Sequence, residues 1–112
     1  MELQIEELPG NVRLAIPIGR WDVKGASEID LRLSAVAGSG HPMIIDMSQV
    51  NYISSMGIRT IVMSAKATAL KGGKLALLAP QPHVEEALRT AGIERILPIC
   101  DDLEAATVAT TP

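Results

Sequence analysis

The stretch over residues 43–71 joins a short apolar run to an amphipathic helix, and this pairing limits the folds open to the chain. The run Met43-Ile44-Ile45, which Asp46 closes, is typical of a strand covered on both faces. After a polar connection, apolar residues recur at helical spacing, at Ile58, Ile61, Val62, Ala65 and Ala69. Gly72-Gly73 then provides a helix stop signal. The stretch therefore predicts a buried strand followed by a helix that packs on the sheet.

The rest of the chain repeats this alternation. Period-two patterns predict strands over 2–7 and 12–18 around the turn signal Pro9-Gly10-Asn11, and Pro17 requires a free side or a bulge. Further along, the patterns predict a helix from a cap at Asp22 or Ser27 to Gly38, a strand over 74–79, a helix over 82–90, a short edge strand over 96–99 and a last helix capped by Asp101. We expect one domain over residues 1–112, with 108–112 as a frayed tail. Its fold class is α/β, a single mixed β-sheet that opens with a β-hairpin and is packed by about four helices.

Composition narrows the class of protein. Hydrophobic residues make up 47% of the 112 residues, but Phe is absent and Trp and Tyr occur once each, so the core must be aliphatic. A net charge of −3 argues against a nucleic-acid or anionic-membrane surface, because these need a concentrated basic field. No apolar run is long enough for a membrane span, and the N-terminus lacks the features of a signal peptide. The single cysteine, Cys100, excludes an internal disulfide and fits a reducing compartment, so we expect a cytoplasmic protein.

The sequence carries no pattern of an enzyme. His41, His83 and Cys100 have no paired spacing for a metal, and the phosphate-binding motifs G-x-x-x-x-G-K-[ST] and G-x-G-x-x-G do not occur. Counting alone does not exclude a Ser-His-Asp triad, but no G-x-S-x-G elbow is present. Asp22 and Asp46 are expected to be caps or solvated carboxylates at one rim of the sheet. We therefore expect no catalytic residues, no metal and no cofactor.

Two adjacent hydroxyls stand where the central helix begins. If Ser54 is the N-cap, Ile53 and Ile58 have the spacing of a hydrophobic staple, and Ser55 at the first helical position projects into solvent. On the residues alone, both serines can be ordinary capping and loop residues. Large apolar residues and cations continue outward along the helix, at Arg59, Met63, Lys66 and Leu70. This stripe suits either a protein-binding surface or the margin of the core.

The segment over residues 44–59, IIDMSQVNYISSMGIR, resembles the signature of the STAS domain of bacterial anti-sigma-factor antagonists. That signature runs from an apolar strand through Asp to an apolar-aromatic-apolar run, then Asp or Ser, Ser, a small residue, Gly and Leu or Ile. Gly19-Arg20-Trp21-Asp22 is similar to the family's Gly-x-x-Asp loop. Gly72-Gly73-Lys74-Leu75 is similar to its helix-to-strand turn, and residues 84–99 resemble its third helix and last strand.

The resemblance implies a switch in partner binding. The unphosphorylated members of this family bind an anti-sigma factor that is also a serine kinase, and so release the sigma factor. The kinase then phosphorylates the serine at the helix start, here Ser55, and a PP2C-type phosphatase restores it. This chain has Ser54 where many members have Asp, so Ser54 is the second choice for the modified residue, and Met56 adds bulk after the site. The implied partner-binding residues are Trp21, Asp22, Ser54, Met56, Gly57, Arg59, Met63 and Lys66.

Two alternatives stay open at this point. A STAS domain that never switches can serve as a scaffold subunit of a signalling or lipid-transport complex. A nucleotide hydrolase or a receiver-like phospho-acceptor is the enzyme-class alternative, but a receiver needs an acidic pair at the end of its first strand, and this chain lacks one. We expect a monomer or weak homodimer that binds neither nucleic acid nor membrane.

Overall fold

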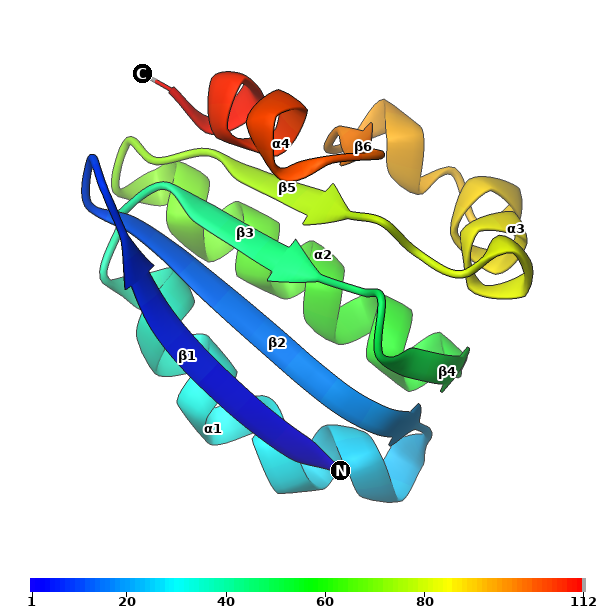
Figure 1. Ribbon diagram of the computed structural model, residues 1–112. Coiled ribbons are helices and arrows are strands. Elements are labelled where there is room, and N and C mark those ends of the chain that lie inside the picture. Colours follow the sequence, from blue (N-terminus) through cyan, green and yellow to red (C-terminus); the bar gives the residue numbers. More distant parts are fainter. Residues whose placement is uncertain (112) are drawn as a thin grey trace.

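The chain opens with a β-hairpin and continues as strands that alternate with helices (Figure 1). The computed structural model describes residues 1–111. Its elements are β1 (Glu2–Leu8), β2 (Val12–Trp21), α1 (Val23–Gly38), β3 (Met43–Asp46), β4 (Val50–Ile53), α2 (Ser55–Leu70), β5 (Leu75–Leu78), α3 (Pro82–Thr90), the 3-10 turn η1 (Ile93–Arg95), β6 (Ile99–Cys100) and α4 (Leu103–Thr110). The predicted α/β class, with one mixed sheet that opens with a hairpin and four α-helices, is confirmed.

The sheet runs in the order β1-β2-β3-β5-β6, and β4 pairs with the far end of β2. Only β1 and β2 are antiparallel; the other pairs are parallel. β3 pairs with β2 over residues 13–15 and β4 pairs with it over residues 19–21, so Pro17 lies where neither strand needs its missing N–H. The expected free side at Pro17 is confirmed, and an irregularity follows between Gly19 and Arg20.

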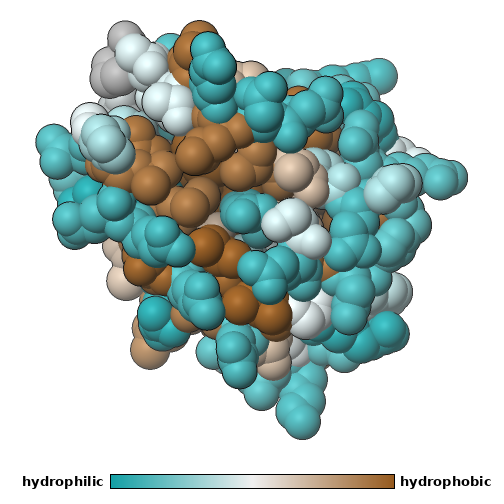
Figure 2. Space-filling model, in the orientation of Figure 1, coloured by the Kyte–Doolittle hydropathy of each residue, from teal (hydrophilic) through white to brown (hydrophobic). Residues whose placement is uncertain are grey.

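Helices cover the two faces of the sheet unequally. The larger core contains Ile29 and Leu33 of α1, Ile61 of α2 and Leu88 of α3, packed against one face of the sheet. On the other face only α4 contributes, through Ala106 over Ile44 and Ala76. Figure 2 looks onto this second face and shows hydrophobic side chains gathered at its centre inside a hydrophilic border. Within residues 1–111, no helix is long and apolar enough to cross a membrane.

Several expectations about elements were wrong. The polar connection predicted before the central helix contains the strand β4. The last helix begins after Asp102, whose carboxylate accepts a hydrogen bond from the Ala105 amide, and not after Asp101. It extends to Thr110, so the expected frayed tail over 108–112 is helical to that residue, while Pro112 lies outside the described residues. The edge strand expected over 96–99 is shorter and lies further along the chain, at Ile99–Cys100.

The inner face of α2 is rotated from the predicted one. Its buried positions are Gly57, Ile61, Ser64 and Thr68. Of the other predicted positions, Ile58, Val62 and Ala65 are partly buried against the core, whereas Ala69 is exposed. Thr68 is tolerated there because its hydroxyl donates hydrogen bonds to the Ser64 and Ala37 carbonyl oxygens. A hydropathy pattern does not predict this inner face, because it counts Ser and Thr as polar even where the backbone satisfies their hydroxyls.

Replacement of Ala79 by glycine is expected to stabilise the protein by up to about 1 kcal/mol. Ala79 follows β5 with a φ of 51°, a left-handed conformation that costs an L-residue about 1–2 kcal/mol. Glycine removes this cost, but it also gives the unfolded chain more conformational freedom, which lowers the gain in stability by about 0.5–1 kcal/mol. Urea unfolding measures the difference. Asn11→Gly is the control, because Asn11 has a φ of 61° but belongs to a residue type that tolerates this region, so its gain is smaller.

Candidate functional site

The first turn of α2 is held against the end of β2 by Ser54. The Ser54 amide and hydroxyl both donate to the Trp21 carbonyl oxygen, at 2.8 and 2.9 Å. The same hydroxyl accepts a hydrogen bond from the Gly57 amide at 3.2 Å, which makes Ser54 the N-cap. The Ser54 oxygen therefore already makes two hydrogen bonds inside the fold, and the predicted capping register is confirmed.

Ser55 is placed differently from its neighbour. It is the first residue of α2 and is exposed, and its hydroxyl has no hydrogen-bond partner within residues 1–111. It borders a shallow depression between α2 and α3, together with His83 and Glu86. The helix N-terminus beside it carries a partial positive charge, and the first turn contains no acidic residue. An anion attached to Ser55 is thus compatible with a folded domain.

Outward side chains of α2 continue from Ser55 along the helix. Arg59 and Lys66 are exposed, and Arg59 makes no ion pair in the part of the chain that the structure describes. Met56 and Met63 are 41% and 56% exposed and line a groove of about 230 Å³ between α1 and α2. Exposed methionine is an adaptable contact for a partner protein. These features favour the docking interpretation of this stripe over a core margin.

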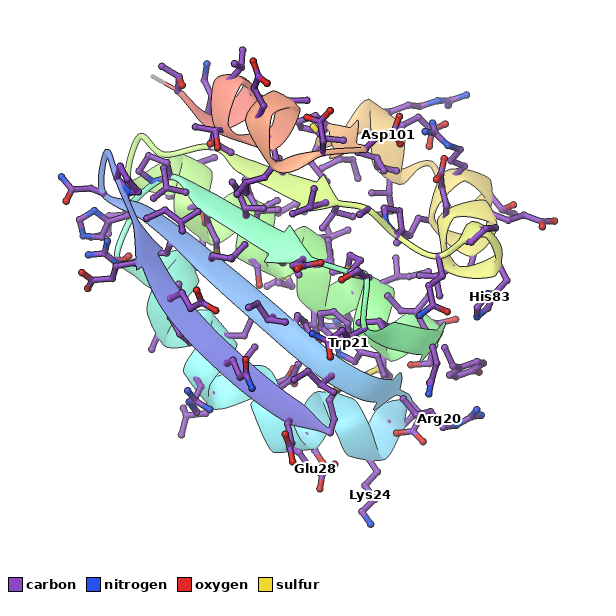
Figure 3. The ribbon with its side chains drawn as sticks, viewed as in Figure 1. Arg20, Trp21, Lys24, Glu28, His83 and Asp101 are labelled. Atoms are coloured by element: carbon purple, nitrogen blue, oxygen red, sulfur yellow. The ribbon has the colours of Figure 1, made fainter. Side chains whose placement is uncertain are left out.

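Trp21 does not belong to this surface. Its side chain is fully buried, so the expectation that it contacts a partner was wrong for the folded domain. A Cβ at Gly57 would lie 3.0 Å from the indole ring, so Gly57 is also buried and allows the helix to approach Trp21 closely. The indole N–H has no hydrogen-bond partner among the described residues. Trp21, labelled in Figure 3, and Gly57 therefore form a buried contact behind the first turn of α2.

Asp22 follows Trp21 and caps α1. Its carboxylate accepts a hydrogen bond from the Gly25 amide at 2.7 Å and lies 3.3 Å from Arg20 Nε. The Gly25 hydrogen bond, and secondarily Arg20, lower the pKa of Asp22 below its ordinary value, so the carboxylate is ionised at neutral pH. The capping role is the one predicted for Asp22 as an alternative to Ser27, and it leaves the carboxylate half-buried at the edge of the site.

Two surface residues beside the site were not predicted from the sequence. The Arg20 guanidinium lies 3.9 Å from the centroid of the Tyr52 ring, and Tyr52 is 38% exposed. Arg20 and Tyr52 are neighbours only because β4 pairs with β2, and β4 was not predicted. His83, also visible in Figure 3, fixes this strand to α3 through a 2.6 Å hydrogen bond between its Nε2 and the Asn51 carbonyl oxygen. Arg and Tyr are common among residues that dominate binding energy at interfaces.

Substitution of the two serines by alanine is expected to separate their structural roles. Ser54→Ala removes the cap of α2 and the hydroxyl bond to Trp21, and should lower the free energy of unfolding by about 1–2 kcal/mol. Ser55→Ala changes an exposed residue without hydrogen bonds and should stay within about 0.5 kcal/mol of the unmodified chain. Urea unfolding of both variants checks this. Equal losses would contradict the assigned register.

Comparison with known proteins gives this geometry a family context. The STAS domain family model matches residues 3–106. BtrV of Bordetella bronchiseptica, which carries the name of an anti-sigma factor antagonist, is 29% identical over 110 residues, covering 97% of this chain and 94% of that protein. An anti-sigma factor antagonist from Mycobacterium paratuberculosis has a similar structure, with a TM-score of 0.87 at 20% identity over 97% of this chain and 92% of that one. Phosphorylated SpoIIAA of Bacillus has a TM-score of 0.72 at 16% identity over 96% of this chain and 97% of that one.

Proposed function

Because this chain belongs to the STAS domain family, with a match over residues 3–106, we propose that it is an anti-sigma factor antagonist controlled at Ser55. In its unphosphorylated form it binds an anti-sigma factor with serine kinase activity, and the sigma factor is released. Phosphorylation of Ser55 ends the binding, and a PP2C-type phosphatase restores it. The observation that carries the proposal is the exposed, unbonded Ser55 hydroxyl beside a serine whose own hydroxyl is occupied.

The placement of the two hydroxyls supports Ser55 over Ser54 as the acceptor. A kinase must bring the serine oxygen into line with the γ-phosphate of ATP, which requires an accessible hydroxyl. Ser54 is half-buried, and its modification would break the cap and the bond to the Trp21 carbonyl. Ser55 requires no such rearrangement. Ser55 therefore serves as the switch, and Ser54 keeps the scaffold in place.

Electrostatics support dissociation without unfolding. A phosphate adds about −1.5 to −2 charges, which a helix N-terminus tolerates, so the modified domain stays folded. A partner docked over Ser55 must instead remove water from that charge, and an uncompensated buried charge costs several kcal/mol. Reversal of a complex from 99% bound to 99% free takes about 5.5 kcal/mol, which is within this range. The partner surface includes Asp22, Met56, Arg59, Met63 and Lys66.

Phosphopeptide mapping after incubation with the cognate kinase and labelled ATP tests the acceptor. We expect label on the peptide that contains Ser55. The Ser55→Ala variant should lose the label, whereas Ser54→Ala should still be phosphorylated. Label on Ser54 alone would refute the assignment. Phosphate that resists alkaline hydroxylamine identifies a serine ester and rules out an acyl phosphate on Asp46.

A further inference from the structure

The last strand of the sheet covers only part of its neighbour. β5 has four residues, but β6 pairs with it only at Leu77 and Leu78. Pro98 precedes β6 and has no N–H to extend the ladder. Figure 1 accordingly shows β6 beside the carboxyl-terminal half of β5, with no strand beside the other half. The first half of β5 therefore has no strand paired along its β6 side.

The backbone groups of Leu75 point toward this open edge. Even-numbered residues of this region bond to β3, as in the 2.9 Å bond from the Met43 amide to the Lys74 carbonyl oxygen. Odd-numbered residues face β6: the Leu77 amide donates to Pro98 at 2.9 Å and the Ala79 amide to Cys100 at 2.8 Å. By the same alternation the Leu75 N–H and C=O face the β6 side, where nothing within residues 1–111 pairs with them. An unpaired backbone group away from water is costly, so this edge favours a hydrogen-bonding occupant.

A groove of about 270 Å³ follows this edge. Ala65 and Ala69 of α2 line it from one face of the sheet, and Ala109 of α4 lines it from the other. These side chains are small, which leaves a lane between the two helices. Ile96, which is 52% exposed, and Leu97 line the groove across from Leu75. The lane is thus apolar on both faces and open along one strand edge.

The positive charge at the groove favours a ligand with an acidic group. Lys74 is the one charged residue among those that line it, and its ammonium donates only a long 3.4 Å hydrogen bond to the Thr111 carbonyl oxygen. Apolar side chains are required on both faces of an inserted strand, because α2 and α4 cover both. The suitable ligand is therefore an extended segment of apolar residues with an acidic side chain near Lys74.

We propose that this groove binds an extended apolar-acidic peptide segment of a partner protein, which adds a short strand beside the open half of β5. The groove includes Ala69, near the carboxyl end of α2, whereas Ser55 is at the amino end, fourteen residues or roughly 21 Å away along the helix axis. The two surfaces can be occupied together, and phosphorylation of Ser55 leaves this one unchanged. A second copy of the chain is disfavoured, because the edge of a folded sheet is too thick to enter a lane bounded by helices on both faces.

Titration of the isotope-labelled protein with acetyl-Asp-Val-Ala-Val-amide tests the proposal by NMR. We expect the Leu75 amide resonance to move and its hydrogen exchange to slow at least tenfold, because the peptide pairs with that N–H. The same peptide with its central amides N-methylated keeps the side chains but loses the donors, and should bind at least tenfold more weakly. Equal binding of the two peptides, or no binding of the first, would overturn the proposal.

Two variants with matched controls separate the groove from non-specific association. Ala69→Leu fills the lane and should abolish binding, whereas Ala35→Leu makes the same change at an exposed position of α1 and should not affect it. The unmodified protein should bind the aspartate peptide more tightly than the same peptide with lysine in place of aspartate. Lys74→Glu should reverse this order of affinities. Loss in both leucine variants, concentration-dependent dimerisation through this groove, or decanoate binding with no peptide binding would each refute the peptide assignment. The Ser55 kinase assay is independent of all of these outcomes.

Discussion

Ser55→Asp is expected to weaken binding to the anti-sigma factor by about 100-fold or more, while Ser55→Ala binds as the unmodified chain does. Aspartate places a permanent negative charge at an exposed position of the proposed interface. When the partner docks, this charge loses its water, and even with Arg59 one turn away a net cost of about 3 kcal/mol corresponds to roughly 100-fold in affinity. Isothermal titration calorimetry with the purified anti-sigma factor measures both constants.

The control for this prediction is the neighbouring position. Ser54→Ala should alter stability more than affinity, because the Ser54 hydroxyl is bonded within the fold. Circular dichroism must show that every variant is folded before affinities are compared. Full binding by a folded Ser55→Asp variant would exclude the switch and leave a STAS scaffold that does not respond to phosphorylation.

Gly25→Ala is expected to lower the free energy of unfolding by about 3 kcal/mol. A Cβ at Gly25 would lie 2.3 Å from the Arg20 carbonyl oxygen and 3.3 Å from the Asp22 carboxylate oxygen. Backbone atoms cannot give way as a side chain can, so the first turn of α1 must move away from β2. That movement also disturbs the hydrogen bond between the Gly25 amide and Asp22, and with it the cap.

Gly38, in the same helix, is the matched comparison. A Cβ there meets nothing within 4 Å, so Gly38→Ala should raise stability by about 0.5–1 kcal/mol through reduced freedom of the unfolded chain. Urea unfolding of the two variants should therefore shift in opposite directions. Similar midpoints would show that α1 is not as close to the end of β2 as the structure places it.

Features set by local chemistry were predictable from the sequence. The cap at Ser54 follows from the preference of a hydroxyl for a free amide two or three residues on, and the free side at Pro17 follows from a missing N–H. Ser55 could be placed outward for the same reason, because it follows the cap. Such features need only the identity of residues a few positions apart.

Features set by distant parts of the chain were not predictable in this way. Trp21 is amphipathic, and only the packing of Gly57 against its ring shows that it is buried. The contact between Arg20 and Tyr52 depends on β4, a four-residue strand with only two buried positions, Val50 and Ile53. Ser64 and Thr68 are polar residues that the fold buries, and the backbone satisfies the Thr68 hydroxyl in the core. In each case a tertiary contact overrides the local preference.

Both helices that enter the site begin from one pair of residues, since the Trp21 carbonyl anchors α2 and the Asp22 carboxylate caps α1. Trp21 is also the only tryptophan in the chain and lies directly beneath the first turn of α2. Its intrinsic fluorescence consequently arises from the point where the two helices are tied together. The emission spectrum of the unlabelled protein thus gives an optical record of whether that junction is closed, with no dye attached to the surface that a partner must approach.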